Sequence, residues 1–481
     1  MGEAFMELIK TQADSGGAWV GEAKTAVVDK ATGEEIARVP DLGAAETREA
    51  IEAAHQAFQS WSKTTAKQRS LILRRWYELI VENAEGLAVL LSCEQGKPLQ
   101  EARGEITYGA AFVEFFAEQA KRVYGETIPS FKSDARIVVL KQPVGVVAAV
   151  TPWNFPNAMI TRKVSPALAV GCTAVVKPAE DTPLSALALA ALAEEAGVPP
   201  GVLNVVTSSN PVPVGEELTS NEKVRVVTFT GSTEVGRILM RQSASTIKKV
   251  SLELGGNEPF IVFDDADLEK AIAGAMASKY RNAGQTCVCA NRIYVQSGVY
   301  ERFAEMLVEA TSGLKVGPGR EEGVTVGPLI NADGLAKVED HVQDAVGKGA
   351  TVAAGGKRHA LGGTFFEPTV LTDVTAEMKV AREETFGPVA PLFRFEDEAD
   401  VIAQANDTPF GLAAYFYARD IGRVWRVAEA LDFGMVGVNE GVMSSELAPV
   451  GGVKQSGLGR EGSHHGIEEF VEQKYVLMGG L

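Results

Sequence analysis

The chain has 481 residues, too many for a single hydrophobic core, so two or three domains are expected. Apolar residues make up 46% of it and charged residues 23%, the balance of an ordinary soluble globular protein. The formal net charge of −17 argues against nucleic acid or an anionic membrane surface as the main partner. An anionic substrate would need a local basic pocket against this general field.

The N-terminus and the cysteines indicate a cellular compartment. Residues 1–17 have neither the basic and apolar regions of a secretion signal nor the Arg-rich character of a transit peptide. No segment approaches the roughly 20 uninterrupted apolar residues of a membrane helix. Four cysteines in a chain of this length do not form a disulfide framework. We therefore expect a cytoplasmic protein.

The first quarter of the chain predicts hairpins followed by helices. Residues 17–40 predict short β hairpins, with Gly33 in a turn. In residues 44–120, apolar residues such as Ile51 and Ala54 recur at helical spacing. These apolar stripes indicate helix faces that pack against a core.

From residue 136 onward, short apolar strands alternate with helices. Thr182-Pro183 is a typical helix start, and Gly197 is a typical helix stop. Continuously apolar strands separated by helices are typical of a parallel sheet covered on both faces, so we expect a doubly wound, Rossmann-like domain. Its ligand would lie beyond the carboxyl ends of the strands. The expected strands are residues 173–177, 201–206, 224–230 and 250–254.

The second half repeats the same rhythm. Residues 259–440 alternate strand and helix patterns and so predict a second α/β domain. Residues 465–481 end in a β-like run with little nearby to pair with. A terminal strand that pairs across a subunit boundary would solve this edge problem.

Two cysteines lie one residue apart in Gly-Gln-Thr-Cys-Val-Cys-Ala, residues 284–290. A zinc site needs four ligands, and here there is one Cys-x-Cys with no histidine nearby, so no metal is expected. Three interpretations of Cys287 and Cys289 stay open at this point: buried structural thiols, a redox pair, or one nucleophile with a neighbour.

Two polar residues stand at positions suited to catalysis. Glu253 lies between two leucines at the carboxyl end of a strand, where burial would raise its pKa and suit it to general-base work. Asn154 is held between aromatic residues and prolines in Thr-Pro-Trp-Asn-Phe-Pro, and a rigid amide is what an oxyanion hole needs. A surface ion pair for the glutamate and a loop cap for the asparagine are the plainer interpretations.

Two further motifs suit a nucleotide. Lys177 ends a strand and Glu180 follows it, so both side chains could bind ribose hydroxyls at the ligand edge. Phe-Thr-Gly-Ser-Thr-Glu-Val-Gly, residues 229–236, follows a strand and opens a helix, where glycines allow close approach of a phosphate. Because it is not Gly-x-Gly-x-x-Gly, it is weak support for a dinucleotide by itself.

Together, these motifs resemble the aldehyde dehydrogenase superfamily in order and spacing over nearly the whole chain. Within it, the chain is most similar to the succinate-semialdehyde dehydrogenases, through the double cysteine and through residues 160–163, 397–406 and 439–445. The superfamily motifs cover residues 151–156, 177–180, 229–236, 252–263, 281–292, 383–391 and 449–462.

The resemblance implies covalent catalysis. Cys287 is similar to the nucleophile that attacks the aldehyde carbon, and Asn154 to the amide that holds the resulting oxyanion. Glu253 is similar to the base that activates the hydrolytic water, which favours a free acid as product over a coenzyme A ester. Lys177 is expected both to take part in catalysis and to contact the cofactor.

The resemblance also implies a nicotinamide cofactor. Lys177 and Glu180 are similar to the residues that bind the adenosine ribose. A carboxylate at Glu180 would repel a 2′-phosphate, so NAD is expected, with NADP accepted more weakly. The other residues similar to cofactor contacts are Pro152, Trp153, Phe229, Gly231, Ser232, Leu254, Glu384 and Phe386.

Three residues predict the substrate by the same resemblance. Arg162, Arg281 and Ser445 match the positions that hold the distal carboxylate of succinate semialdehyde. Glutarate or 2-oxoglutarate semialdehyde stays open, because one methylene changes binding by only ~1–3 kcal/mol. A broad-range aldehyde dehydrogenase stays open as well. So does a non-catalytic protein with a borrowed fold, although such a protein could have lost the cysteine, base or amide.

Cys289 and the chain's organisation complete the expectations. Cys289 either packs as a buried thiol or forms a reversible disulfide with Cys287 that shuts the site, as the animal members suggest. The expected fold is α/β, with a Rossmann-like cofactor domain, an α/β catalytic domain and a small β oligomerisation element of a dimer or tetramer. These parts would cover residues 1–121 with 143–254, residues 255–445, and residues 122–142 with 446–481 respectively.

Overall fold

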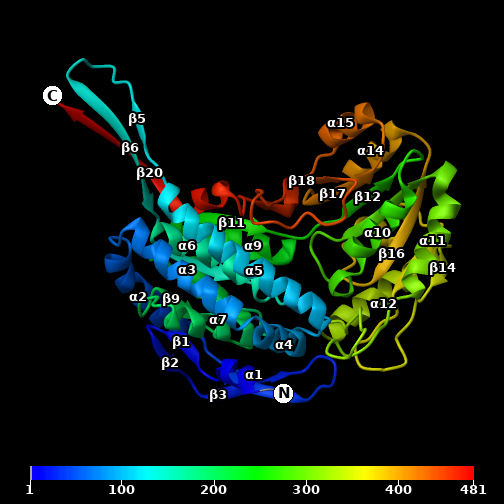
Figure 1. Cartoon of the computed structure of the whole chain (residues 1–481), viewed down its shortest axis with the longest axis horizontal. Helices are drawn as coiled ribbons and strands as arrows, with labels where there is room; N and C mark the ends of the chain where they lie inside the picture. The colour runs from blue at the N-terminus through cyan, green and yellow to red at the C-terminus, as the bar shows by residue number, and fades with distance from the viewer. Residues whose placement is uncertain (1–2) are drawn as a thin grey trace.

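The structure is a computed structural model that describes residues 3–481, so the first two residues of the N-terminal segment lie outside the described residues. The fold is mixed α/β. Two large sheets lie in separate lobes, and a small third sheet projects from the body of the molecule (Figure 1). Among residues 3–481, none of the helices is long and apolar enough to cross a membrane.

The first lobe is built on a six-stranded sheet with the order β19-β11-β10-β7-β8-β9. Five strands are parallel, and β19 runs antiparallel against β11. The parallel strands are short and mostly buried, as expected for a sheet covered on both faces. Their bounds are β7 Val146–Val150, β8 Thr173–Lys177, β9 Leu203–Val205, β10 Val224–Thr230, β11 Lys249–Glu253 and β19 Gly457–Leu458.

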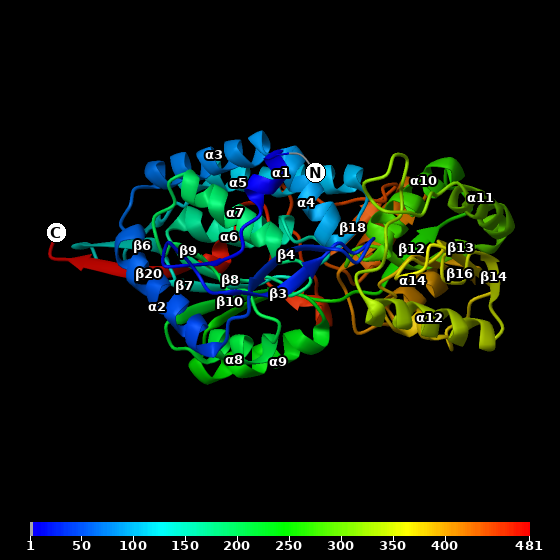
Figure 2. The ribbon, with the colours of Figure 1, turned by 90° about the horizontal axis from the view of Figure 1, so that it is seen from below.

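Two layers of helices cover this sheet, with α3, α5, α6 and α7 on one side and α2, α8 and α9 on the other (Figure 2). The largest hydrophobic core lies between the sheet and the first layer. The predicted doubly wound arrangement is therefore confirmed. The helices of this lobe are α2 Ala44–Trp61, α3 Ala66–Glu82, α4 Ala84–Gln95, α5 Leu99–Gln119, α6 Ala158–Val170, α7 Leu184–Glu195, α8 Pro211–Ser220 and α9 Thr233–Ser243, with 3-10 turns η1 Ala120–Arg122 and η2 Ala244–Thr246.

The second lobe contains a seven-stranded sheet with the order β14-β15-β16-β13-β12-β17-β18, parallel except for β14. The strands are β12 Glu258–Val262, β13 Ala290–Gln296, β14 Thr351–Ala354, β15 Thr369–Thr372, β16 Val389–Phe395, β17 Ala413–Tyr417 and β18 Met435–Val438. The helices are α10 Leu268–Lys279, α11 Tyr300–Ser312, α12 Ala332–Gly347, α13 Lys379–Arg382, α14 Glu398–Asn406 and α15 Ile421–Ala430, with 3-10 turns η3 Arg281–Gly284 and η4 Ser297–Val299.

The projecting sheet has the order β20-β6-β5, from β5 Glu126–Ile128, β6 Ala135–Pro143 and β20 Val471–Gly479. The C-terminal run, which the sequence left without a partner, pairs antiparallel with β6 of the same chain along its whole length. Residues 446–481 also supply β19 to the first lobe, after the 3-10 turn η5 Lys454–Ser456, and η6 His464–Phe470 precedes β20. The division of the chain into functional domains stays a prediction.

The N-terminal segment forms two antiparallel hairpins, β1 with β2 and β3 with β4. Gly33 lies in the second turn with φ 75°, a conformation that glycine adopts without strain. Hairpins were expected from residue 17, and the first strand begins slightly earlier. The bounds are α1 Glu3–Leu8, β1 Ala13–Ser15, β2 Ala18–Val20, β3 Ala23–Val28 and β4 Glu35–Pro40.

Candidate active site

A cavity of about 260 Å³ lies between the two lobes. Its walls come from α5 and α6 of the first lobe and from residues 281–288 and 442–444 of the second. Cys287, Glu253 and Arg162 all contribute to its lining. Residues that are far apart in sequence therefore meet around one space large enough for a small molecule.

The loop before Cys287 has an unusual backbone. Asn282 and Ala283 have φ of 51° and 55°, which is uncommon for residues with a Cβ. Gly284 follows with φ 74°, and a Cβ there would collide with the carbonyl oxygen of Gly387. Only glycine fits this close approach, so the loop presents Cys287 to the cavity from a tightly fixed position.

Asn154 lies in the loop between β7 and α6 and is 5% exposed. Its side-chain Nδ2 donates to the carbonyl oxygen of Gln285, 3.1 Å away. Its own carbonyl oxygen accepts from Nζ of Lys97 at 2.8 Å and from Nδ2 of Asn282 at 3.0 Å. The amide loop and the cysteine loop are therefore joined directly.

Glu253 ends β11 and is buried. Nη2 of Arg162 donates to its Oε2, while its Oε1 has no hydrogen-bond partner among the described residues. Burial raises the pKa of Glu253, and Arg162 opposes that rise. This carboxyl therefore holds a proton more readily than an exposed glutamate does.

Glu461 completes a buried cluster of charges beside Glu253. It accepts from Nε of Arg162 and from Nζ of Lys163. Burial opposes ionisation of Glu461, but the two cations outweigh it and lower the pKa of this carboxyl. Glu461 is therefore the firmly ionised member of the cluster, and Glu253 is the one that exchanges a proton more easily.

The surroundings of Cys287 favour the neutral form of its thiol. Burial raises its pKa well above the usual range, the nearby Glu253 carboxylate adds to this, and Arg162 opposes it. A thiolate is the form that attacks an aldehyde, so a base must accept the proton as the reaction begins. Glu253 lines the same cavity and has a free carboxylate oxygen, which suits it to that task.

The two arginines expected to bind a substrate carboxylate differ in their surroundings. Two donor atoms of Arg162 already bond to Glu253 and Glu461, so a substrate would have to use its remaining donors or displace a protein carboxylate. Arg281 also lines the cavity, and its Nε is buried without a hydrogen-bond partner in residues 3–481. Its guanidinium lies 5.4 Å from the centre of the Phe155 ring. The binding role of both arginines stays a prediction.

The expected serine lies beside the cavity rather than in its wall. Ser444 lines the cavity, whereas the half-buried Ser445 accepts a hydrogen bond at 3.2 Å from the backbone N–H of Leu447. The two hydroxyls are adjacent in the same loop, so a substrate would meet Ser444 first in this structure.

Cys289 is buried behind the cavity wall. Its Sγ donates to the carbonyl oxygen of Gly284 at 3.2 Å, and Nζ of Lys279 donates to the sulfur at 3.6 Å. Burial raises the pKa of Cys289, and the charge of Lys279 opposes the rise. The described residues contain no group of three or more His, Cys, Asp or Glu arranged to hold a metal ion.

The residues expected to hold the adenosine half of a dinucleotide lie at strand ends of the first sheet. Nζ of Lys177, at the end of β8, donates to Oε2 of Glu180 at 2.8 Å. Ser232 is the N-cap of α9 and accepts from Val235 N. Gly231 allows close backbone approach at the positive end of that helix, so an anionic pyrophosphate fits there.

The expected nicotinamide contacts lie nearer the cavity. Glu384 accepts from Gly256 N at 3.3 Å, and burial raises the pKa of its carboxyl to about 7. Phe386 packs edge-to-face against Trp153, with ring centres 5.5 Å apart. Pro152 precedes Trp153 in the same loop. Phe229 and Leu254 are buried in one small hydrophobic cluster at the ends of β10 and β11.

Sequence reasoning did not single out several residues of this site. Glu461 and Lys163 were inside motifs that carried the resemblance, so a search for charged pairs to Arg162 could have found them. Lys97 and Glu105 lie in residues 44–120, which the sequence predicts as helices that pack on a core. The presence of a lysine and a glutamate within an apolar pattern was the only sign of a further role. Ser444 is separated from the predicted serine by one position.

A doubly wound, dinucleotide-type sheet beside a cavity lined by a cysteine and a glutamate, with an amide in the adjoining loop, is typical of an α/β oxidoreductase. A family model described as the aldehyde dehydrogenase family matches residues 19–476. The chain therefore belongs to the aldehyde dehydrogenase family.

Known relatives share close to the full length of the chain. It is 62% identical to succinate-semialdehyde dehydrogenase [NADP(+)] GabD of Escherichia coli (strain K12), and the match covers 98% of each chain. It is also 62% identical to 3-sulfolactaldehyde dehydrogenase of Pseudomonas putida, over 98% of each, and to glutarate-semialdehyde dehydrogenase of Pseudomonas aeruginosa, over 99% of each. A crystal structure titled as an E. coli NADP dependent enzyme has a TM-score of 0.97 and 62% identity and covers 98% of this chain and 99% of that one.

Proposed function

We propose that this aldehyde dehydrogenase oxidises succinate semialdehyde to succinate with NAD, as in the degradation of γ-aminobutyrate. The observation that carries the proposal is Arg281, whose Nε is buried without a partner in the described chain at the cavity that holds Cys287. A cation left without a bonded carboxylate at a substrate cavity favours a substrate that brings its own carboxylate.

In the first half of the proposed reaction, Cys287 gives its proton to Glu253 and its sulfur attacks the aldehyde carbon. The carbonyl π electrons become the oxyanion of a thiohemiacetal, which the Nδ2 of Asn154 stabilises. One proton of Nδ2 is used on Gln285, so the second is available for the substrate oxygen. A bound nicotinamide cofactor supplies the hydride acceptor.

In the second half, water hydrolyses the acyl-cysteine thioester. Glu253 has by then released the Cys287 proton to solvent, so its carboxylate can take a proton from the water as the water oxygen attacks the thioester carbon. The C–S bond then breaks, the Cys287 sulfur takes the proton from Glu253, and the free acid leaves. In this proposal the Oε1 of Glu253, which has no hydrogen-bond partner among the described residues, accepts that proton. A buried carboxyl with a raised pKa binds a proton more readily than an exposed glutamate, which suits a group that accepts a proton in the reaction.

The proposed preference for NAD depends on Glu180. Its carboxylate is partly exposed and bonded to Lys177, so a ribose 2′-hydroxyl could donate to it, while a 2′-phosphate would be repelled. The E. coli relative is named for NADP, which makes the preference a direct question. Replacement Glu180→Ser should raise kcat/KM with NADP relative to NAD, and an unchanged ratio would contradict this role.

Another aldehyde with an anionic end is the second candidate, because relatives with the same identity are named for glutarate semialdehyde and for 3-sulfolactaldehyde. A methylene more or less shifts binding by only ~1–3 kcal/mol, so small differences in the cavity would decide between them. 2-Oxoglutarate semialdehyde and uncharged aldehydes complete the set to be compared.

The test is kcat/KM for each of these aldehydes, and for an uncharged aldehyde of similar length, with NAD and with NADP. We expect the highest value for succinate semialdehyde with NAD, and Arg281→Gln should remove most of the advantage over the uncharged aldehyde. The matched control is Arg292→Gln, a buried arginine that bonds backbone carbonyls outside the cavity. A preference for the uncharged aldehyde would overturn the substrate proposal.

We also propose that the two neighbouring cysteines form a reversible switch. Peroxide would oxidise Cys287 to a sulfenic acid, and the sulfur of Cys289 would displace water to give a disulfide. Inactivation by peroxide should then be reversed by dithiothreitol in the wild type. If peroxide inactivation and its reversal by dithiothreitol are the same in Cys289→Ala as in the wild type, the proposed switch is contradicted.

A homo-oligomer, either dimer or tetramer, is proposed for the assembly. The projecting sheet (Figure 1) and its adjoining loops have exposed apolar side chains, among them Tyr475 in β20 and Tyr124 and Phe131 on either side of β5. Such side chains on an open sheet are typical of a surface that packs against another chain. Light scattering should give a mass of two or four chains, and a monomer at micromolar concentration would contradict the proposal.

A further inference from the structure

We propose that Lys97 and Glu105 are positioning residues that orient the Asn154 amide and thereby set the rate of the acylation half-reaction. Both side chains are essentially buried, with 1% and 0% exposure, and neither was assigned a role by sequence. The inference deepens the proposed function, because it concerns the oxyanion site of the same reaction.

The Lys97 ammonium has two hydrogen-bond acceptors and an aromatic ring around it. Nζ donates to Oε2 of Glu105 at 2.6 Å and to the carbonyl oxygen of Asn154 at 2.8 Å. It also lies 3.8 Å from the centre of the Phe155 ring, within range of a cation–π contact. The ammonium therefore contacts both Asn154, which supplies the proposed oxyanion donor, and Phe155, which follows it.

Glu105 holds the other side of the same loop. Its Oε1 accepts from the backbone N–H groups of Asn157 at 2.9 Å and Ala158 at 3.2 Å, at the start of α6. Its Oε2 is bonded to Lys97. The Lys97–Glu105 pair thus bonds the backbone at Asn154 and again at Asn157 and Ala158. These bonds restrict rotation of the loop between them.

The same helix reaches the cysteine loop. Glu101, one turn before Glu105 on α5, accepts from the backbone N–H of Asn282 at 2.7 Å. Nδ2 of Asn282 then donates to the carbonyl oxygens of Asn154 at 3.0 Å and Gln285 at 3.2 Å. With Lys97, this donor fills both lone-pair positions of the Asn154 carbonyl, which fixes the plane of that peptide.

The charge of Lys97 also lies against the backbone of Asn154, the residue whose side chain is the proposed oxyanion donor. The ammonium lies against the Asn154 carbonyl, while the Glu105 carboxylate is turned toward the start of α6. A fixed positive group near a developing oxyanion favours it in a buried site, where water screens little. A buried ion pair is a costly way to fill a core, so stability alone explains it poorly.

The test is a rapid-mixing, single-turnover measurement of NADH formation with enzyme in excess over aldehyde. Lys97→Met should slow this step by roughly 10–100-fold, in the range seen when an oxyanion donor is lost or misplaced, with KM changed much less than kcat. Glu105→Gln keeps an acceptor for the α6 N–H groups but removes the charge that holds Lys97, and should slow the same step by a smaller factor.

Glu94→Gln is the matched control. Glu94 is buried, and its two oxygens accept at 2.8 Å each from the N–H groups of Leu184 and Ser185 at the start of α7, as Glu105 does at α6. It does not contact Asn154. We expect Glu94→Gln to lower Tm by an amount similar to Glu105→Gln while leaving the single-turnover rate unchanged.

The outcomes separate the two proposals. If Lys97→Met forms NADH in a single turnover at the wild-type rate, the positioning role is overturned while the proposed function stands. If the wild type oxidises none of the aldehydes tested, both fail. If Lys97→Met does not fold, the decision passes to Glu105→Gln against Glu94→Gln, and equal single-turnover rates in those two variants overturn the role.

Discussion

Glu253 has one carboxylate oxygen bonded to Arg162 and one without a hydrogen-bond partner in the described chain. This asymmetry matters because a general base needs a fixed orientation and a free lone pair at the same time. Arg162 supplies the orientation, and Glu461 keeps Arg162 in place on its far side. The cavity therefore contains a carboxyl group, the proposed base, that Arg162 orients while one of its oxygens keeps no hydrogen bond within the described chain.

The replacement Glu253→Gln should separate the two halves of the reaction. Glutamine still accepts from Arg162, so the cavity should keep its shape, but it cannot take a proton from water. Because Glu253 also accepts the Cys287 proton in the proposed first half, the first NADH per active site should form roughly 10–10²-fold more slowly than in the wild type, and later turnover should slow further, by roughly 10²–10⁴-fold. Intact mass spectrometry should show the acyl-enzyme accumulating, and full steady-state turnover would contradict the role.

The same residue predicts a pH dependence. Burial raises the pKa of Glu253 above its ordinary value of 4.5, so the protonated, inactive form persists to higher pH than for an exposed glutamate. In the wild type, kcat should fall as the pH is lowered through this raised pKa. The residual turnover of Glu253→Gln should not show that step, and a step in both would assign it to another group.

A second pH dependence concerns the stability of the folded protein and comes from Asp14. Burial, with a contribution from the Glu194 charge, raises its pKa to about 7, and its Oδ1 has no partner among residues 3–481. A raised carboxyl pKa favours the folded state below the unfolded pKa of 3.8, and this advantage is lost as the pH rises to about 7. Asp14→Asn should therefore stabilise the enzyme above pH 7, by up to about 4 kcal/mol.

The measurement for Asp14→Asn is Tm at pH 5 and at pH 8, compared with the wild type. The gain should be larger at pH 8 than at pH 5. Glu22→Gln is the control, because the Glu22 side chain is 82% exposed and should give the same Tm as the wild type at both values. Equal Tm values for Asp14→Asn and wild type at pH 8 would show that Asp14 titrates normally.

At the scale of single residues, the sequence could predict which residues matter but not which contacts they make. Cys287, Glu253 and Asn154 follow from motifs and strand ends, and the structure brings Cys287 and Glu253 to one cavity. Arg162 and Glu461 are 299 positions apart, so no local pattern indicates that they bond. The occupied donors of Arg162 therefore emerge only from the folded chain.

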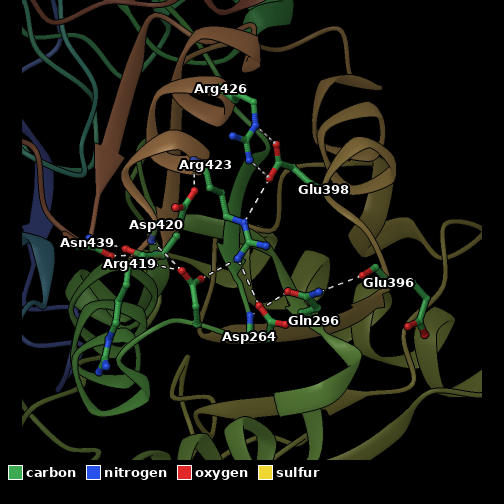
Figure 3. Close-up of polar contacts among 11 residues, drawn as sticks. Asp264, Gln296, Glu396, Glu398, Arg419, Asp420, Arg423, Arg426 and Asn439 are labelled. Atoms are coloured by element: carbon green, nitrogen blue, oxygen red, sulfur yellow. Dashed lines mark hydrogen bonds and ion pairs between the residues drawn. The ribbon is translucent and has the colours of Figure 1, made fainter.

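At the scale of elements, one arginine joins three segments of the second lobe (Figure 3). Arg423 on α15 donates to Asp264 at 3.2 Å, to Asp265 at 2.8 Å and to Glu398 at 3.2 Å. Its guanidinium also lies 4.6 Å from the centre of the Phe263 ring. Arg423 thus connects α15 with α14 and with the turn after β12.

Loss of this connection should affect stability without affecting chemistry. Arg423→Met leaves three carboxylates close together without their shared cation, so Tm should fall by roughly 2–4 °C, equivalent to about 1 kcal/mol in a domain of this size. The control is Arg419→Met, whose side chain is 69% exposed and makes a single ion pair at 3.6 Å. Both variants should keep wild-type kcat/KM, and equal Tm values would contradict the role of Arg423.

Long apolar elements were predictable, and short ones were not. The expected strands 173–177 and 224–230 coincide with β8 and β10, because a continuous buried run and its flanking turns are visible in the sequence. β19 is only two residues long, too short for any periodicity. It exists because the returning chain passes the edge of β11, which is a tertiary effect.

At the scale of the whole molecule, the chain crosses between the lobes and then returns. After β18 of the second lobe it passes residues 442–450 at the cavity and adds β19 beside β11, where Gly457 pairs with Glu253. A Cβ at Gly457 would collide with the carbonyl oxygen of Leu252, so glycine permits this approach. The returning segment therefore supports the strand that ends in the proposed base.

Ser456 is the central link of that return. Its Oγ donates to the carbonyl oxygen of Gly255 at 2.7 Å and accepts from the N–H of Gly411 at 2.9 Å, and the residue is fully buried. One hydroxyl thus joins the chain just after Glu253 to a loop of the second lobe. No other side chain makes these two bonds among the described residues.

Ser456→Ala should therefore weaken the contact between the lobes. Two buried backbone groups would lose their partner, at a cost of about 1–3 kcal/mol, and the wall behind Glu253 would loosen. We expect Ser456→Ala to lower Tm and to lower kcat by a larger factor than it changes KM. Ser456→Thr keeps a hydroxyl at this position and tests whether a hydroxyl alone is enough to maintain the wild-type Tm and kcat. Thr219→Val, a buried hydroxyl on α8 away from the cavity, should lower Tm without this loss of kcat, and the same kcat loss there would contradict a link through Ser456.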